Sequence, residues 1–302
     1  MLKDIYIKNY KLFKNFKIEG FDRVNLITGA NNIGKTALLE SLYIKAYSKN
    51  IQNFVHSLAD IYYFRYHLKE VKIQELLEYF NGIRLDIIEL ILEDKGLIRE
   101  VNIKLKHKNI KENKNKVSLK PQENKNINFI ETSLFSDEVL KKHYSYAQIK
   151  DKEAFIDEIL NKFDSNIIRF KFIDKTPMVK YKGIDKYIHI NEIGEGVKRF
   201  LFILVTMFKS ENGSLFIDEI ENGIWYRNIN LVWETIFLLS EELNVQIFAT
   251  THSNDTIKNF SKFNGTLFEM GLNKQNNIDY IKYKNEFLLE ELQNNREVRG
   301  WR

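Results

Sequence analysis

The chain has 302 residues, of which 44% are hydrophobic, so it can bury the core of one large α/β domain or of a domain with an inserted lobe. It contains no cysteine, which excludes disulfides, thiolate metal sites and a cysteine nucleophile, and which agrees with a reducing cytoplasm. The net charge of +5 is compatible with attraction to a nucleic-acid backbone, although Lys, Asn and Ile are abundant throughout, as an AT-rich genome would produce.

The N-terminal part is predicted to be a small β-lobe followed by a helix. Residues 2–8, 16–19 and 24–28 alternate like short strands, and residues 35–48 have the spacing of a helix. The first residues therefore read as a strand and not as a signal peptide. No apolar run approaches the length that crosses a bilayer, so we expect a cytoplasmic protein without a membrane partner.

Residues 49–126 are predicted to form an inserted lobe. Residues 50–80 have helical apolar spacing, and residues 84–92 and 97–106 alternate like the two strands of a hairpin. Between residues 104 and 125, eight lysines stand against two glutamates, which is typical of a solvated loop. This Lys/Asn-rich loop is either an ordinary polar loop or a segment that contacts DNA.

The second half of the chain is predicted to build the main sheet. Its expected strands are 127–131, 167–173, 178–182, 186–190, 214–218, 245–250 and 266–270, and its expected helices are 137–148, 152–163, 195–208, 228–243 and 254–260. From residue 195 onward helices and strands alternate tightly, which favours a parallel sheet covered by helices. Ligands of such sheets bind at the carboxyl ends of the strands.

A glycine-rich loop follows the strand at 24–28. Gly29 to Thr36 fits the pattern Gly-x4-Gly-Lys-Ser/Thr between a strand and a helix, where backbone N–H groups and the helix end can surround phosphates. Lys35 is expected to reach the outer phosphates, and the Thr36 hydroxyl to hold Mg²⁺. The alternative is a plain glycine turn. The predicted nucleotide-binding residues are Gly29, Ala30, Asn31, Asn32, Ile33, Gly34, Lys35, Thr36 and Ala37.

Two carboxylates end the apolar strand at 214–218. Asp218 is expected to support the Mg²⁺ that Thr36 also contacts, and Glu219 to act as general base on the attacking water. An apolar strand that ends in acidic residues is also a common surface transition. The phosphate loop in the same chain favours the catalytic interpretation.

A histidine follows the apolar strand at 245–250. The imidazole of His252 could bond the γ-phosphate or hold the water in line with Glu219. In the alternative interpretation this segment only begins a helix, with Ser253 or Asn254 as its N-cap. The two interpretations are compatible.

Gly194, Glu195 and Gly196 open the helix at 195–208 and are predicted to form a second anion-binding helix end. One molecule cannot easily direct both ends at one triphosphate, whereas two molecules can if each presents this segment to the nucleotide of the other. The alternative is a tight turn with Glu195 in the first helical turn, where an acidic residue is favourable.

In this order, the segments resemble the ABC-type ATPase heads of the SMC and RecF class, in particular the bacterial AAA family ATPases related to the OLD proteins. Residues 5–10 and 25–40 resemble the N-terminal lobe and Walker A of that class, residues 193–199 its signature segment, residues 216–223 its Walker B and D-loop, and residues 250–253 its switch histidine.

The resemblance spans about residues 1–48 and 127–271. It implies one α/β domain over residues 1–302, an ABC/SMC-type P-loop NTPase head with a mostly parallel sheet and flanking helices. An N-terminal antiparallel lobe and the inserted helical/β lobe at 49–126 would complete it. The resemblance also implies that the nucleotide is ATP.

The chain departs from the pattern of that class in several places. Gly194 stands where transporters have a serine, so the contact with the second copy would rest on backbone N–H groups and on Lys198 or Arg199. Trp225 stands where relatives often have a histidine. No Q-loop glutamine follows the strand at 127–131, where Thr132 and Ser133 stand, and Gln148 is the remaining candidate. We therefore expect slow or partner-dependent hydrolysis.

The resulting expectation is an ATPase that forms a head-to-tail homodimer around Mg·ATP and controls DNA or a separately encoded nuclease or toxin. The resemblance adds genome maintenance or anti-phage defence. OLD proteins continue into a Toprim nuclease domain, whereas this chain stops at Arg302, so we expect it to lack a nuclease of its own. The alternatives are an ATP-gated sensor or scaffold with little hydrolysis and, as a poorer fit, the nucleotide-binding subunit of a transporter.

Overall fold

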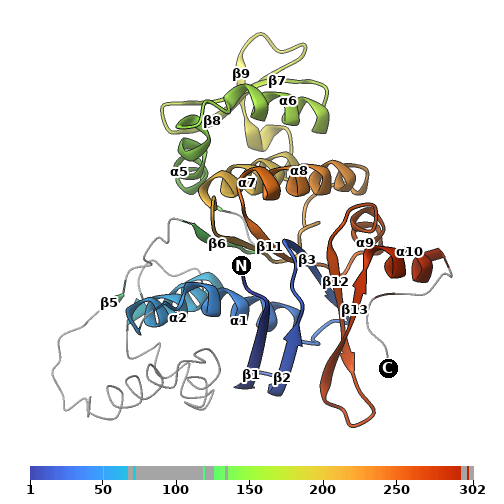
Figure 1. Cartoon of the computed structure of the whole chain (residues 1–302). Coiled ribbons are helices and arrows are strands. Elements are labelled where there is room, and N and C mark those ends of the chain that lie inside the picture. The colour runs from blue at the N-terminus through green and yellow to red at the C-terminus, as the bar shows by residue number, and fades with distance from the viewer. Residues whose placement is uncertain are drawn as a thin grey trace.

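A six-stranded sheet forms the centre of the chain (Figure 1). The computed structural model describes residues 1–49, 51–66, 71–72, 118–119, 126–132, 135–293 and 298. The described strands are β1 (Asp4–Tyr10), β2 (Phe13–Glu19), β3 (Val24–Gly29), β4 (Val71–Lys72), β5 (Ser118–Leu119), β6 (Ile127–Ile130), β7 (Ile167–Ile173), β8 (Thr176–Tyr181), β9 (Tyr187–His189), β10 (Ser214–Ile217), β11 (Gln246–Thr250), β12 (Thr266–Leu272) and β13 (Ile278–Lys284).

Helices cover both faces of this sheet (Figure 1). They are α1 (Lys35–Tyr47), α2 (Ile51–Tyr66), α5 (Asp137–Gln148), α6 (Glu153–Phe163), α7 (Glu195–Lys209), α8 (Ile229–Glu242), α9 (Asn254–Phe260) and α10 (Asn285–Gln293), with short 3₁₀ turns η2 (Ile190–Glu192) and η3 (Tyr226–Asn228). Within the described residues, we find no helix long and apolar enough to span a membrane.

The sheet has the strand order β13-β12-β3-β11-β10-β6. All neighbouring pairs are parallel except β12 and β13, which are antiparallel at one edge. Because parallel strands end at the same edge, the loops after β3, β6, β10 and β11 meet there. The predicted fold class, a P-loop NTPase head with a mostly parallel sheet, is confirmed.

Successive side chains of the central strands enter two different cores. In β10, Leu215 and Ile217 pack in the core that contains α5 to α9, whereas Phe216 packs in the core that contains α1 and α2. A strand alternates its side chains between the two faces of a sheet, so a strand covered on both faces is apolar throughout. This explains the continuous apolar runs that end at the site.

The smaller lobes follow the prediction in part. β1 and β2 form the antiparallel N-terminal hairpin that the sequence indicated, and β7, β8 and β9 form a separate antiparallel sheet on the side of α5 and α6 (Figure 1). Of the predicted insertion, α2 packs through Phe54, Leu58 and Ile61 into the core beneath α1. The predicted helix after residue 72, the hairpin at 84–106 and most of the Lys/Asn-rich loop lie outside the described residues, so the predicted lobe boundaries stay a prediction.

Candidate functional site

The phosphate loop connects β3 to α1. Gly34 precedes the helix in the left-handed region, at φ 99°, a conformation that costs glycine little because it has no Cβ. Helix α1 has neither a side-chain cap nor an acidic residue in its first turn, so its N–H groups and positive end stay available to an anion. Lys35 Nζ donates to the carbonyl oxygens of Gly29 (2.9 Å) and Ala30 (3.0 Å), so the ammonium lies over the same loop.

The loop residues differ in what they can offer a ligand. Ala30, Asn31 and Asn32 are exposed, whereas the side chains of Ile33 and Ala37 are buried. Ile33 and Ala37 could therefore face a phosphate only with their backbone groups, and not with their side chains.

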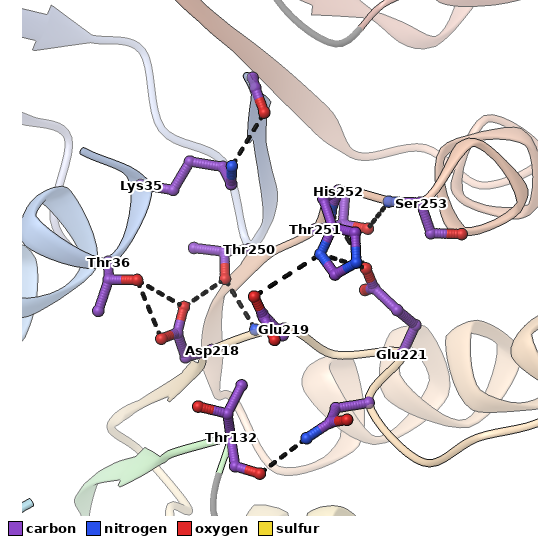
Figure 2. Close-up of polar contacts among 12 residues, drawn as sticks. Lys35, Thr36, Thr132, Asp218, Glu219, Glu221, Thr250, Thr251, His252 and Ser253 are labelled. Carbon is purple, nitrogen blue, oxygen red and sulfur yellow. Dashed lines mark hydrogen bonds and ion pairs between the residues drawn. The ribbon is translucent and has the colours of Figure 1, made fainter. Parts of the chain in front are cut away.

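The predicted metal residues lie together at the ends of β10 and α1 (Figure 2). The Thr36 hydroxyl donates to the Asp218 carboxylate, with Oγ1 3.0 Å from Oδ2 and 3.3 Å from Oδ1. The Thr250 hydroxyl donates to Asp218 Oδ1 over 2.6 Å, and the Asp218 N–H donates to the carbonyl oxygen of Ile130 over 2.8 Å. Asp218 is thereby fixed from three neighbouring elements.

Glu219 turns away from the strand immediately after Asp218. Its backbone is left-handed, with φ 47°, and its N–H donates to Thr250 Oγ1 over 2.8 Å. His252 Nδ1 lies 3.7 Å from Glu219 Oε1 and 3.4 Å from Glu221 Oε1 (Figure 2). The structure therefore brings together the predicted base, Glu219, and the predicted sensor, His252. It also places a second carboxylate, that of Glu221, beside His252.

The helix-capping interpretation of this segment is confirmed. Ser253 is the N-cap of α9, with its hydroxyl accepting from the Thr256 N–H over 3.3 Å. His252 itself plays no part in the cap, and its side chain is half exposed toward the site.

Burial shifts the pKa values of two charged groups in this site. It raises the pKa of the Asp218 carboxyl, an effect that hydrogen bonds from Thr250 and Thr36 oppose and that the charge of Glu219 increases. Burial also lowers the pKa of the Lys35 ammonium, against the attraction of Glu219 and Asp218. A buried carboxylate beside other acids and hydroxyl oxygens is the environment that a hard dication such as Mg²⁺ would stabilise.

Gly194 is the N-cap residue of α7 and has φ 142°, and no side chain caps this helix end. Apart from Gly194 itself and its two chain neighbours, no heavy atom lies within 4 Å of the point where a Cβ of Gly194 would stand, so there is open space beside this residue. A Cβ on Gly196 would stand 2.5 Å from the carbonyl oxygen of Gly223, so Gly196 is required for close packing against the turn after Glu219. Glu195 is exposed in the first helical turn, as the alternative interpretation expected.

The expectation that Lys198 or Arg199 would reach a second copy is wrong for this conformation. Lys198 is 6% exposed and donates to Asp137 Oδ1 over 2.8 Å. Arg199 is 5% exposed and donates to the carbonyl oxygens of Asp218 (2.9 Å) and Glu131. Both cations point inward because α7 is buried over most of its length, from Val197 to Lys209.

Gln148 is wrong as a Q-loop residue. Helix α5 starts beside the beginning of α7, where Asp137 meets Lys198, and ends beside its far end, where Lys150 meets Glu211 at 2.8 Å. Gln148 therefore lies about one helix length from the phosphate loop. Thr132 does lie at the site, where its carbonyl oxygen accepts from Asn222 Nδ2 over 2.7 Å, and Ser133 lies outside the described residues.

Three residues of the site have roles that the sequence analysis did not predict. Thr250 links the Asp218 carboxylate to the Glu219 backbone, Glu221 Oε1 accepts from the His252 N–H over 3.1 Å, and Arg199 joins α7 to two strand ends. The position of Thr250 at the end of a buried strand could have indicated that it belongs to the site, because the carboxyl ends of parallel strands lie at the same edge of the sheet. The burial of Arg199 carried no local sequence signal.

We expect Arg199→Lys to lower kcat for ATP hydrolysis by roughly 10- to 100-fold with little change in KM. A lysine keeps the charge but cannot donate to two carbonyl groups in the fixed geometry of a guanidinium, and each charge-assisted bond is worth about 1.5–3 kcal/mol. Steady-state phosphate release measures both constants. Lys209→Met removes a buried cation at the other end of α7 as the control, and wild-type turnover in Arg199→Lys would contradict the positioning role.

The comparisons with known proteins agree with this site. Residues 147–257 match the AAA ATPase domain family, a segment that includes Gly194, Asp218, Glu219 and His252 but not the phosphate loop. A Helicobacter pylori (strain ATCC 700392 / 26695) protein called ATP/GTP phosphatase is 27% identical to this chain over an alignment 323 positions long. The alignment covers 85% of this chain and 87% of that protein. An uncharacterised Methanocaldococcus jannaschii protein, MJECL10, is 25% identical over 189 residues, which cover 61% and 76%.

The solved structures add the fold. An SMC head bound to the C-winged helix domain of ScpA has a TM-score of 0.54 at 12% identity, covering 94% of this chain and 98% of that one. The SMC head domain from Thermotoga maritima has a TM-score of 0.51 at 10% identity, covering 93% and 98%. The chain therefore has the fold of an SMC head, and its similarities to the AAA ATPase domain family and to the ATP/GTP phosphatase support an enzyme that hydrolyses ATP.

Proposed function

We propose that the chain is an ATP-driven switch that dimerises head to tail and controls DNA processing or a separately encoded effector. The observation that carries the proposal is the line of contacts from Thr36 through Asp218, Thr250 and Glu219 to His252, at one edge of the sheet. It joins the residues proposed as metal ligands, base and sensor in one chain.

Each residue has a role in this proposal. The phosphate loop and Lys35 bind the triphosphate, and the Thr36 hydroxyl and Asp218 carboxylate hold Mg²⁺, directly or through water. No group of three or more His, Cys, Asp or Glu residues that could hold a metal occurs in the described part of the chain. The Mg²⁺ would therefore take its remaining ligands from phosphates and water, as it commonly does. When bound there, Mg²⁺ would supply positive charge that offsets the charge developing on the phosphates.

Glu219 takes the proton of the attacking water in this scheme, and His252 orients it. The two side chains are 41% and 52% exposed, so a water molecule can reach both. Because His252 lies within 4 Å of both Glu219 and Glu221, it can hold one carboxylate in place while its other ring nitrogen faces the nucleotide.

The open end of α7 supplies the reason for a dimer. Its N–H groups at Gly194, Glu195 and Gly196, which no side chain caps, would bind the outer phosphate of the nucleotide held by a second copy. The buried cations Lys198 and Arg199 leave this contact to the backbone. The catalytic site is then composite, and two copies form two sites around a twofold axis.

A composite site makes turnover depend on protein concentration. We expect the specific rate of phosphate release to rise with protein concentration across the dimerisation range and to level off once dimers dominate. Saturating Mg·ATP keeps nucleotide binding constant during the titration. A specific rate that is constant over a thousandfold dilution, in a protein that stays monomeric by light scattering, would contradict the composite site.

The controlled partner is inferred from the fold. A head of this fold occurs in complex with a winged-helix domain of another protein, which supports a separate effector here as well. Phosphate release with and without duplex DNA separates the possibilities. Stimulation by DNA supports a role in DNA processing, and a low rate that DNA leaves unchanged supports the ATP-gated sensor for a nuclease or toxin. Thr132, at the position where the class has a Q-loop glutamine, favours a low unstimulated rate.

A further inference from the structure

Glu131 stands beside Asp218 where two neighbouring strands of the central sheet end. β6 and β10 are parallel, and the last pair in their register is Ile130 with Ile217. The Asp218 N–H continues this ladder, because it donates to the Ile130 carbonyl oxygen over 2.8 Å. The next residues along the two strands, Glu131 and Asp218, are therefore neighbours across the sheet.

The side chains of this pair point to the face of the sheet that α1 covers. Two residues earlier in each strand, Phe129 and Phe216 lie on this face with their rings stacked, 6.5 Å apart between centroids. Side chains two residues apart in a strand share a face, so those of Glu131 and Asp218 lie there too. The hydrogen bond of Asp218 with Thr36, the second residue of α1, agrees with this direction.

A cavity of about 290 Å³ opens in front of the pair. Glu131 and Asp218 line it together with Thr36, so two carboxylates and the hydroxyl of the phosphate loop border one space. The cavity is therefore continuous with the place where the Thr36 hydroxyl and the Asp218 carboxylate would hold a dication.

The charges on the cavity wall favour a cation at this end. Among the described residues that line the cavity, Arg65 is the one cation, and its Nε donates to Glu40 Oε1 over 2.6 Å. Glu40 also accepts from Lys11 Nζ, so two cations already contact that carboxylate. The Asp218 carboxylate instead accepts hydrogen bonds from neutral hydroxyl groups. An added cation would be attracted most strongly to the end of the cavity where Asp218 and Glu131 lie.

Arg199 fixes the backbone beneath both carboxylates. Its guanidinium donates to the carbonyl oxygen of Asp218 over 2.9 Å and to that of Glu131. Arg199 is 5% exposed, so this link between the two strand ends is part of the core. The separation of the two strand ends is thereby set before any ligand binds, which suits Mg²⁺ because this ion demands near-ideal octahedral geometry.

We propose that Glu131 holds the Mg²⁺ together with Thr36 and Asp218, by accepting a hydrogen bond from a water molecule that the ion retains. The inference rests on the proposed function, in which Thr36 and Asp218 are the Mg²⁺ residues. Mg²⁺ gives up its water reluctantly and usually keeps several molecules, so a carboxylate one water away is a suitable partner. Such outer partners orient the groups bound to a metal and raise its affinity.

The affinity for Mn²⁺, which replaces Mg²⁺ and has an electron paramagnetic resonance signal when free in water, tests the proposal without turnover. With the protein in excess over AMP-PNP, Glu131→Gln should bind Mn²⁺ roughly 10- to 100-fold more weakly than the wild type. Asp218→Asn gives the loss expected for a proposed metal residue, and Glu131→Asp, which keeps the charge, should recover part of the affinity. Glu138→Gln removes an exposed carboxylate in the first turn of α5 and should bind Mn²⁺ as the wild type does.

Two measurements without metal separate this role from a structural one. In EDTA, the melting temperature of Glu131→Gln and its affinity for AMP-PNP should equal those of the wild type, and a decrease in either would overturn the assignment. Wild-type Mn²⁺ affinity in Glu131→Gln, beside a loss in Asp218→Asn, would also overturn it and would leave the proposed function intact. If Asp218→Asn binds Mn²⁺ as the wild type does, the metal site of the proposed function fails, and the role of Glu131 fails with it.

Discussion

Glu219→Gln is expected to hydrolyse ATP about 10²- to 10⁴-fold more slowly than the wild type, with unchanged affinity for ATP. The amide keeps the shape of the side chain but cannot accept the proton of the attacking water. The loss should therefore appear in kcat and not in binding, because the contacts of Glu219 are with Thr250 and His252. Steady-state phosphate release gives the rate, and isothermal calorimetry gives the affinity.

The neighbouring carboxylate provides the control for this prediction. Glu221 Oε1 lies 3.4 Å from His252 Nδ1, closer than Glu219 Oε1 at 3.7 Å, but it also accepts the His252 backbone N–H, which gives it a positioning role. We expect Glu221→Gln to slow turnover by less than about 10-fold, the scale of one lost hydrogen bond. A loss as large as that of Glu219→Gln would show that the general base is not Glu219.

Lys35→Ala is expected to weaken ATP binding by roughly 100-fold or more. The substitution removes the only cation in the predicted phosphate loop, Gly29 to Thr36, and charge-assisted contacts to phosphate are the strongest that such a loop makes. Calorimetry with Mg·ATP measures the change. Lys45→Ala, in the last turn of the same helix, should bind ATP as the wild type does. Unchanged affinity in Lys35→Ala would remove the phosphate-loop assignment.

The sequence was sufficient for the parts of the fold that repeat a strong local pattern. Buried strands such as β10 and β11 are apolar throughout and end in polar residues, so both the strands and the polar residues at their ends were predictable. The boundaries of α5 and α9 also agree with the prediction, because each helix starts directly after a capping serine, Ser136 or Ser253.

The remaining features depend on contacts between distant residues. The edge strand β13 was missed because it is half exposed and carries charges, so its pattern resembles that of a polar turn. Thr250 and Arg199 acquire their roles only when β11 and α7 lie beside β10. The same applies to the contact between Gly196 and Gly223, which joins segments on either side of β10.

The central claim is that this ATPase acts as a pair of copies whose composite sites close on ATP. The most direct measurement is the mass of Glu219→Gln by multi-angle light scattering, with and without Mg·ATP. Slow hydrolysis should preserve the ATP-bound state, so the protein should run at 36.0 kDa without nucleotide and at twice that mass with Mg·ATP. A variant that binds ATP and remains at the monomer mass would contradict the head-to-tail switch.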